Sequence, residues 1–104
     1  MAARVLAIYS HPADPAAFDA YYAQTHIPIA KKIPGLRSYA ISNGGVHDAG
    51  GASSPFYLVA EMGFDSLEAI QQAMQSPAGA ATVADLANFA QGGVTVSFYE
   101  TKDV

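Results

Sequence analysis

His26 is the residue of this sequence whose setting best suits proton transfer, because an imidazole exchanges a proton near neutral pH. Pro28 cannot donate to the carbonyl four residues back, so a helix through this segment should kink or restart near His26. Tyr22 lies one helical turn before His26 and could orient the imidazole by a hydrogen bond. Two interpretations stay open: His26 shuttles a proton, or it caps backbone groups that the proline leaves free.

Glu61 is a second candidate acid or base, since it lies in the middle of the apolar stretch Phe56–Phe64. Burial disfavours the charged form of a carboxyl group and raises its pKa. The alternative is an ion pair at a strand edge with Arg4 or Arg37, the basic residues on or beside predicted strands.

Three tyrosines on predicted strands, Tyr9, Tyr57 and Tyr99, could offer hydroxyl groups to a small, largely apolar organic ligand. Tyrosine is also enriched at subunit interfaces, which is the alternative interpretation. Tyr21 lies on the apolar stripe of a predicted helix and is expected in the core.

Composition excludes several classes of site and partner. The histidines at 11, 26 and 47 are too far apart for a recognised metal spacing, and no phosphate-binding loop or nucleophile elbow is present. There is no cysteine, and a net charge of -4 with five Lys plus Arg disfavours nucleic acid and anionic membranes. We therefore predict no metal, no cofactor, no nucleic acid and no membrane partner. The short apolar run at residues 5–9 resembles neither a signal peptide nor a membrane span, so a cytoplasmic location is expected.

Hydrophobic periodicity predicts the elements that position these residues. Strands are expected at 5–9, 36–42, 56–64 and 94–99, with a glycine-rich, mobile loop at 43–54. One helical section follows Asp14 and ends at Pro34-Gly35, and a second starts at an Asp65 capping box and restarts at Ser76-Pro77. The order predicts an α+β, ferredoxin-like βαββαβ fold with a four-stranded antiparallel sheet, in a single domain of residues 1–104.

The two faces of this sheet are predicted to differ. Val94, Val96 and Phe98 should pack on the helices. The second face is expected to carry residues from three strands: Val5, Ala7 and Tyr9; Tyr57, Val59 and Glu61; and Thr95, Ser97 and Tyr99. Charged residues make up 13% of the chain, against roughly 25% in an average domain. The half-apolar second face therefore predicts a face-to-face homodimer with room for a ligand among the tyrosines.

Two stretches resemble the EthD family. The first is FDAYYAQTHIPIAKKIPGL at residues 18–36, and the second is AEMGFDSLEA at 60–69, followed by Ser76-Pro77 and by ADLANFA at 84–90. The resemblance spans nearly the whole chain, and it matches His26 to the family's histidine. It implies a dimeric α+β barrel, related to small cofactor-free monooxygenases, lactone isomerases, polyketide cyclases and haem-handling enzymes. The family name comes from a locus for ethyl tert-butyl ether degradation, which suggests a role in xenobiotic degradation.

Three functions remain open at this point. The first is a cofactor-independent oxygenase, isomerase or cyclase acting on a small apolar organic molecule, with His26 as proton shuttle and tyrosines positioning the ligand. The second is a non-catalytic protein that carries a hydrophobic metabolite. The third, haem binding through His26 or His47, rests on analogy with the superfamily. Whether the loop at 43–54 closes over a pocket is undecided.

Overall fold

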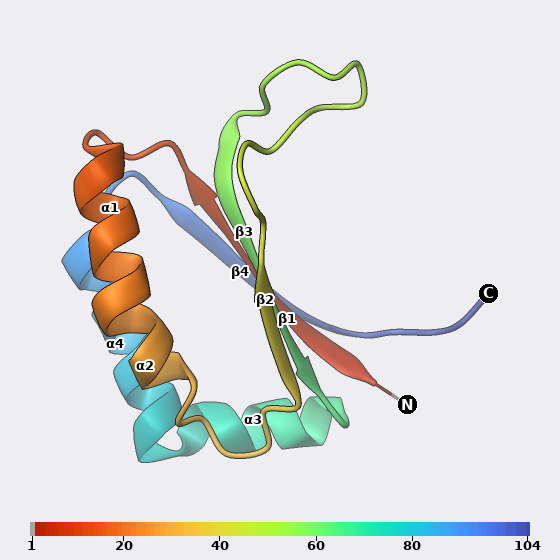
Figure 1. Cartoon of the computed structure of the whole chain (residues 1–104). Coiled ribbons are helices and arrows are strands. Elements are labelled where there is room, and N and C mark those ends of the chain that lie inside the picture. The colour runs from red at the N-terminus through yellow and green to blue at the C-terminus, as the bar shows by residue number, and fades with distance from the viewer. Residues whose placement is uncertain (1) are drawn as a thin grey trace.

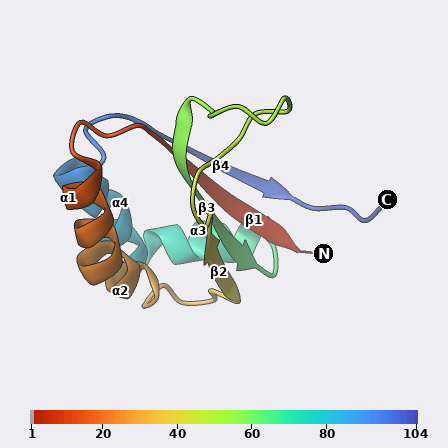
Figure 2. The same ribbon diagram turned by 45° about the horizontal axis from the view of Figure 1, so that its top comes forward.

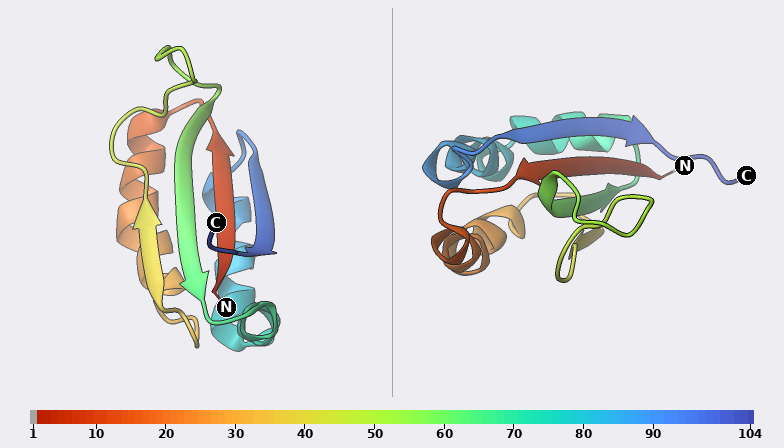
Figure 3. Two further views of the ribbon diagram at one scale, coloured as in Figure 1. Left: turned by 90° about the vertical axis from the view of Figure 1, so that its right-hand side faces the viewer. Right: turned by 90° about the horizontal axis from the view of Figure 1, so that it is seen from above.

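The computed structural model describes residues 2–104. Its four strands, β1 (Ala3–Ser10), β2 (Ser38–Ile41), β3 (Phe56–Phe64) and β4 (Val94–Glu100), form one antiparallel sheet in the order β2-β3-β1-β4. The helices are α1 (Pro15–Tyr21), the π-helix η1 (Tyr22–His26), α2 (Ile27–Ala30), α3 (Leu67–Gln75) and α4 (Pro77–Phe89). All helices lie on one side of the sheet (Figures 1 and 3). The predicted α+β ferredoxin-like fold is confirmed.

The helical irregularity expected near His26 takes the form of the π-helix η1. The Ile27 amide donates to the carbonyl of Tyr22, five residues back, instead of to the usual position four back. This wider turn accommodates Pro28, which has no amide hydrogen and whose ring would crowd a regular helix. As a result Tyr22 and His26 both face the core, with ring centroids 5.2 Å apart.

Side-chain caps fix where the other helices start. Asp14 accepts from the Ala17 amide ahead of α1, and Ser76 both ends α3 and caps α4. The N-cap of α3 is Ser66, not the predicted Asp65. The Asp65 carboxylate lies 2.8 Å from an Arg37 guanidinium nitrogen, and the Ser66 hydroxyl accepts from the Ala69 amide in its place.

The prediction that Val5, Ala7 and Tyr9 of the first strand lie on the sheet face away from the helices was wrong. Ala3, Val5, Ala7 and Tyr9 are buried beneath the helices, while the alternate residues of β1 face the open side. Both rows of β1 are largely apolar, so its period-two pattern could not choose between the faces. The pairing decides it, because Val5 lies opposite Phe98 and Tyr9 opposite Val94, which share the helix side.

Tyr57 was also placed on the wrong face. The register of β1 and β3 shifts between Tyr9 and Ser10, and this irregularity turns the Tyr57 ring toward Phe18 of α1, at a centroid distance of 5.4 Å. The remaining predicted residues of the open face keep their side, since Val59 and Glu61 lie opposite Ile8 and Leu6.

The helix side of β4 is confirmed but incompletely covered. Val96 and Phe98 lie in register with buried residues of β1, yet each stays nearly half exposed at the sheet edge. Among residues 2–104, no helix is long and apolar enough to cross a membrane. A cytoplasmic location stays a prediction.

Candidate functional site

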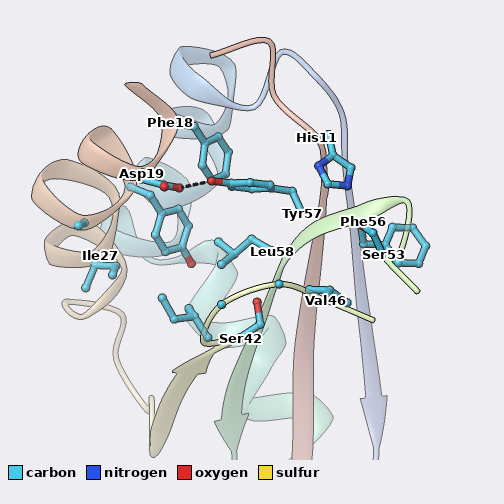
Figure 4. A pocket seen from close by; sticks show the side chains of 15 residues that line it. His11, Phe18, Asp19, Ile27, Ser42, Val46, Ser53, Phe56, Tyr57 and Leu58 are labelled. Carbon is cyan, nitrogen blue, oxygen red and sulfur yellow. Dashed lines mark hydrogen bonds between the residues drawn. The ribbon is translucent and has the colours of Figure 1, made fainter. Parts of the chain in front are cut away.

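A cavity of about 420 Å³ opens between the first helical section, the start of β3 and the glycine-rich loop (Figure 4). Its volume falls within the range of roughly 300–1,000 Å³ that is typical of small-molecule sites. Much of its wall is apolar: Phe18, Ala23, Ile27, Ile41, Val46, Phe56 and Leu58. Polar side chains are fewer: His11, Asp19, Tyr22, Ser42, Ser53 and Tyr57. Such a lining suits a largely apolar ligand with a small number of polar groups.

One end of the cavity brings together His11, Asp19 and Tyr57. The Tyr57 hydroxyl donates to Asp19 Oδ1 at 2.8 Å, and the His11 and Tyr57 rings meet edge to face at 5.6 Å. The hydrogen bond to Asp19, with burial as a smaller cause, raises the pKa of Tyr57. Tyr57 is therefore a neutral phenol at physiological pH. The three residues come from the end of β1, from α1 and from β3 (Figure 4).

His11 also anchors the glycine-rich loop to the sheet. Its Nε2 lies 3.0 Å from the backbone carbonyl of Ser54, a buried residue of the loop. The loop has internal order, because Asp48 Oδ1 accepts from the amides of Gly50 and Ala52, and His47 pairs with Ser53 in an antiparallel bridge. The mobility expected for this loop stays a prediction.

Tyr22 lies in the cavity wall and belongs to a buried aromatic cluster. Its hydroxyl is 2.6 Å from that of Tyr39, and its ring contacts Tyr9 edge to face at 5.7 Å. Burial, together with the neighbouring hydroxyl groups, raises the pKa of Tyr22, and burial also raises that of Tyr9. These groups are neutral hydroxyls. Tyr9 is 1% exposed and does not line the cavity, so its predicted contact with a ligand has no direct route.

His26 lies behind Tyr22, beyond the cavity wall. It is 3% exposed, and its Nδ1 is 2.9 Å from Asp85 Oδ2 on α4. Asp85 Oδ1 accepts from the Tyr21 hydroxyl at 2.6 Å and from the Asn88 amide at 2.9 Å. Burial of Asp85 acts to raise the pKa of its carboxyl, but the bonds from Tyr21, Asn88 and His26 together lower it. Asp85 is therefore ionised, and its hydrogen bond with His26 connects α4 to η1.

Glu61 and Tyr99 lie on the open face of the sheet, away from the cavity. Both side chains are exposed, so the desolvation expected for Glu61 is absent in the single chain. Among residues 2–104 neither suggested arginine pairs with Glu61: Arg37 bonds Asp65, and Arg4 bonds the Ala3 carbonyl. Glu61 therefore lies apart from His26 and Tyr22, the other two candidate catalytic residues.

The structure therefore brings only Tyr22 and Tyr57, of the six predicted site residues, to the cavity. Sequence reasoning missed His11 and Asp19. The available signal was positional, because His11 directly follows the first strand and Asp19 lies one turn into the next helix. In the split βαβ order, the end of a strand and the start of the following helix lie at the same edge of the sheet.

Haem does not fit these residues. The His26 ring is buried against Phe89, with a centroid distance of 4.6 Å, and lies outside the cavity wall. His47 lies on the exposed loop and does not line the cavity either. Neither proposed axial ligand therefore lines the cavity in which a haem group would be held.

Comparison with known proteins places this geometry in a family. The EthD domain profile matches residues 10–93. An uncharacterized 11.0 kDa protein from the thcB–thcC intergenic region of Rhodococcus erythropolis is 41% identical over 101 residues, which cover 97% of this chain and 96% of that protein. A crystal structure of an EthD family protein from Bacillus halodurans C-125 is 38% identical, covers 98% of this chain and 100% of its own, and superposes with a TM-score of 0.88.

More distant structures share the fold alone. They include a dimeric ferredoxin-like protein of unknown function from Thermobifida fusca (17% identity, TM-score 0.69, covering 97% and 92% of the two chains). A hydroxynitrile lyase from Passiflora edulis (10%, 0.76, 99% and 95%) and SnoaB, a cofactor-independent oxygenase from Streptomyces nogalater (14%, 0.63, 99% and 94%), are also similar. With its sequence matched over most of its length and its fold shared with these structures, the chain belongs to the EthD family.

Proposed function

We propose that this chain binds a small, largely apolar organic molecule in the 420 Å³ cavity and acts on it by cofactor-independent proton-transfer chemistry. The observation that carries the proposal is the largely apolar wall of this cavity, with His11, Asp19 and Tyr57 gathered at one end. Oxygenation, isomerisation, cyclisation and lyase chemistry all fit. The cofactor-independent oxygenase and the lyase with this fold support the reaction type only as analogies, because fold does not determine function.

His26 enters this proposal as a positioning residue. It does not line the cavity, and it acts through Tyr22, whose ring it contacts and whose hydroxyl group faces Tyr39. Tyr22 and Tyr57 are the predicted residues that contact the ligand. If a substrate is found, His26→Ala should lower kcat more than it raises KM, since the ligand contacts stay in place.

The experiment that tests cavity binding is an NMR titration with toluene as an apolar probe. Chemical-shift changes should cluster at the cavity residues and saturate. Ala23→Phe places a ring in the cavity and should abolish binding, whereas Ala20→Phe, on an exposed position of α1 outside the cavity, should leave it intact. Binding that survives Ala23→Phe would show that the cavity is not the site.

A non-catalytic binding role is a second candidate, and one observation favours it. The Tyr57 proton is committed to Asp19, and His26 lies outside the cavity, so no predicted acid–base pair meets the ligand directly. A bound compound recovered unchanged after long incubation at saturating occupancy would support carriage. A changed compound would support catalysis.

We also propose that the open face of the sheet forms a homodimer. Leu6, Ile8 and Val59 make an apolar centre on this face, and they are only partly buried in the single chain. The glycine-rich loop and the C-terminal end extend on the side of the sheet away from the helices, where a second copy would lie (Figure 2). The dimeric protein of the same fold from Thermobifida fusca is consistent with this arrangement.

Light scattering tests the dimer. The native chain should show the mass of two subunits, and Ile8→Lys should show that of one, because a buried unpaired charge opposes association. Val83→Lys changes an exposed apolar residue of α4 on the opposite side and should stay dimeric. A native mass of one subunit would refute the proposal.

A further inference from the structure

We propose that the ligand carries a hydrogen-bond donor, an O–H or N–H group, whose hydrogen is shared between His11 Nδ1 and the Tyr57 hydroxyl oxygen. The inference rests on the proposed cavity binding and narrows it to one class of compounds: small apolar alcohols, phenols or amines. The reason is that the His11 Nε2 hydrogen and the Tyr57 hydroxyl hydrogen both form hydrogen bonds within the chain, which leaves only acceptor atoms for the ligand.

The hydrogen bond to the loop determines the tautomer of His11. Its Nε2 lies 3.0 Å from the Ser54 carbonyl oxygen, and a carbonyl can only accept, so Nε2 carries the hydrogen. In a neutral imidazole the other nitrogen, Nδ1, then has a free lone pair and no hydrogen. Since Ser54 is buried, this arrangement is held by the fold. His11 thus presents an acceptor to a ligand in the cavity that it lines.

Tyr57 is also an acceptor toward the ligand. Its hydroxyl hydrogen is directed at Asp19 Oδ1, 2.8 Å away, and the raised pKa of Tyr57 agrees with a retained proton. The phenolic oxygen keeps lone pairs that can accept a second hydrogen bond. Asp19 is exposed and contributes a further carboxylate oxygen, for which residues 2–104 offer no hydrogen-bond partner. A carboxylate can only accept hydrogen bonds. His11, Tyr57 and Asp19 can therefore each accept a hydrogen bond from a ligand.

The hydroxyl group of Ser42 lies at the other end of the cavity from these acceptors (Figure 4). Ser42 Oγ accepts from the Val59 amide at 3.0 Å, so its own hydrogen is free. It suits a ligand carbonyl or ether at the other end. At the opposite end, the chain from Ala2 onward gives neither His11 Nδ1 nor the free lone pairs of the Tyr57 oxygen a hydrogen, and a ligand hydroxyl or amine placed between these acceptors can share its hydrogen with both.

The test compares phenol with anisole, which replaces the O–H by O–CH₃, and with toluene. Dissociation constants come from NMR titrations of the full chain. One additional neutral hydrogen bond should make phenol bind about two- to tenfold more tightly than the other two compounds. Equal affinities for the three compounds would overturn the inference while leaving cavity binding in place.

Two variants assign the acceptors. His11→Lys keeps a nitrogen donor for the Ser54 carbonyl and has no acceptor atom in place of Nδ1, so phenol should lose its preference while toluene binding is unchanged. Tyr57→Phe should have the same selective effect. Spectra unchanged away from the cavity show that each variant is folded. A phenol preference that survives both substitutions contradicts the proposal, whereas failure of all three compounds to bind counts against the proposed function itself.

Discussion

His26 and His11 show how the same type of side chain takes different roles in different surroundings. His26 is buried and its Nδ1 faces a carboxylate, so it belongs to a charged network that joins two helices. His11 is exposed at the cavity, and its Nε2 faces a neutral carbonyl, which leaves Nδ1 available. The difference lies in the partner and in the burial. A buried histidine bound to a carboxylate mainly supports structure, while one held by a backbone carbonyl beside a cavity is free to contact a ligand.

Removal of the buried carboxylate should have the largest effect. Asp85→Ala deprives His26, Tyr21 and Asn88 of their shared acceptor and should lower the free energy of unfolding by ~3 kcal/mol. Urea denaturation measures the change.

The matched control is the exposed pair of Arg37 and Asp65. Its two side chains are each 66% exposed and their attraction is screened by water, so Asp65→Ala should change the free energy of unfolding far less than Asp85→Ala. Equal losses for Asp85→Ala and Asp65→Ala would show that the His26 network is no more important than a surface ion pair.

The contrast also explains what the sequence could predict. Pro28 is a local signal, so the irregularity at His26 could be anticipated, and the strong alternation of residues 56–64 identified β3. The partners of His26 could not be predicted in this way, because Asp85 is 59 residues further along the chain. Tyr9 and Tyr57 were assigned to the wrong face. Both rows of β1 are largely apolar, which hides the orientation of Tyr9, and the register shift after Tyr9 reverses that of Tyr57.

Acid should weaken the His26 network through the carboxylate of Asp85. Asp85 has a folded-state pKa below its ordinary value of 3.8, so its contribution to stability is complete above that value. The contribution is lost as the pH falls through the lowered pKa. Urea unfolding as a function of pH should therefore show a decline below about pH 4 that is shallower in Asp85→Asn. Identical slopes for the native chain and the variant would contradict this assignment.

Removal of one hydroxyl group from the hydrogen-bonded pair of Tyr22 and Tyr39 should lower the free energy of unfolding by less than Asp85→Ala. Tyr22→Phe or Tyr39→Phe leaves one hydroxyl without its partner and should each cost ~1 kcal/mol. The double variant should cost less than the sum of the two, because no unpaired hydroxyl remains. Strict additivity in this cycle would mean that the hydroxyl groups do not depend on one another.

The smallest stability change is expected at His11. Its bond to the Ser54 carbonyl joins an exposed side chain to a surface loop, so His11→Ala should lower the free energy of unfolding by less than ~1 kcal/mol. His11→Gln, which retains the donor, should be closer to the native chain. Amide hydrogen exchange gives a more local measurement, since faster exchange in residues 43–55 should appear in His11→Ala and be suppressed in His11→Gln. If His11→Ala instead destabilised the chain as much as Asp85→Ala, His11 would belong to the core, and the distinction between the two histidines would fail.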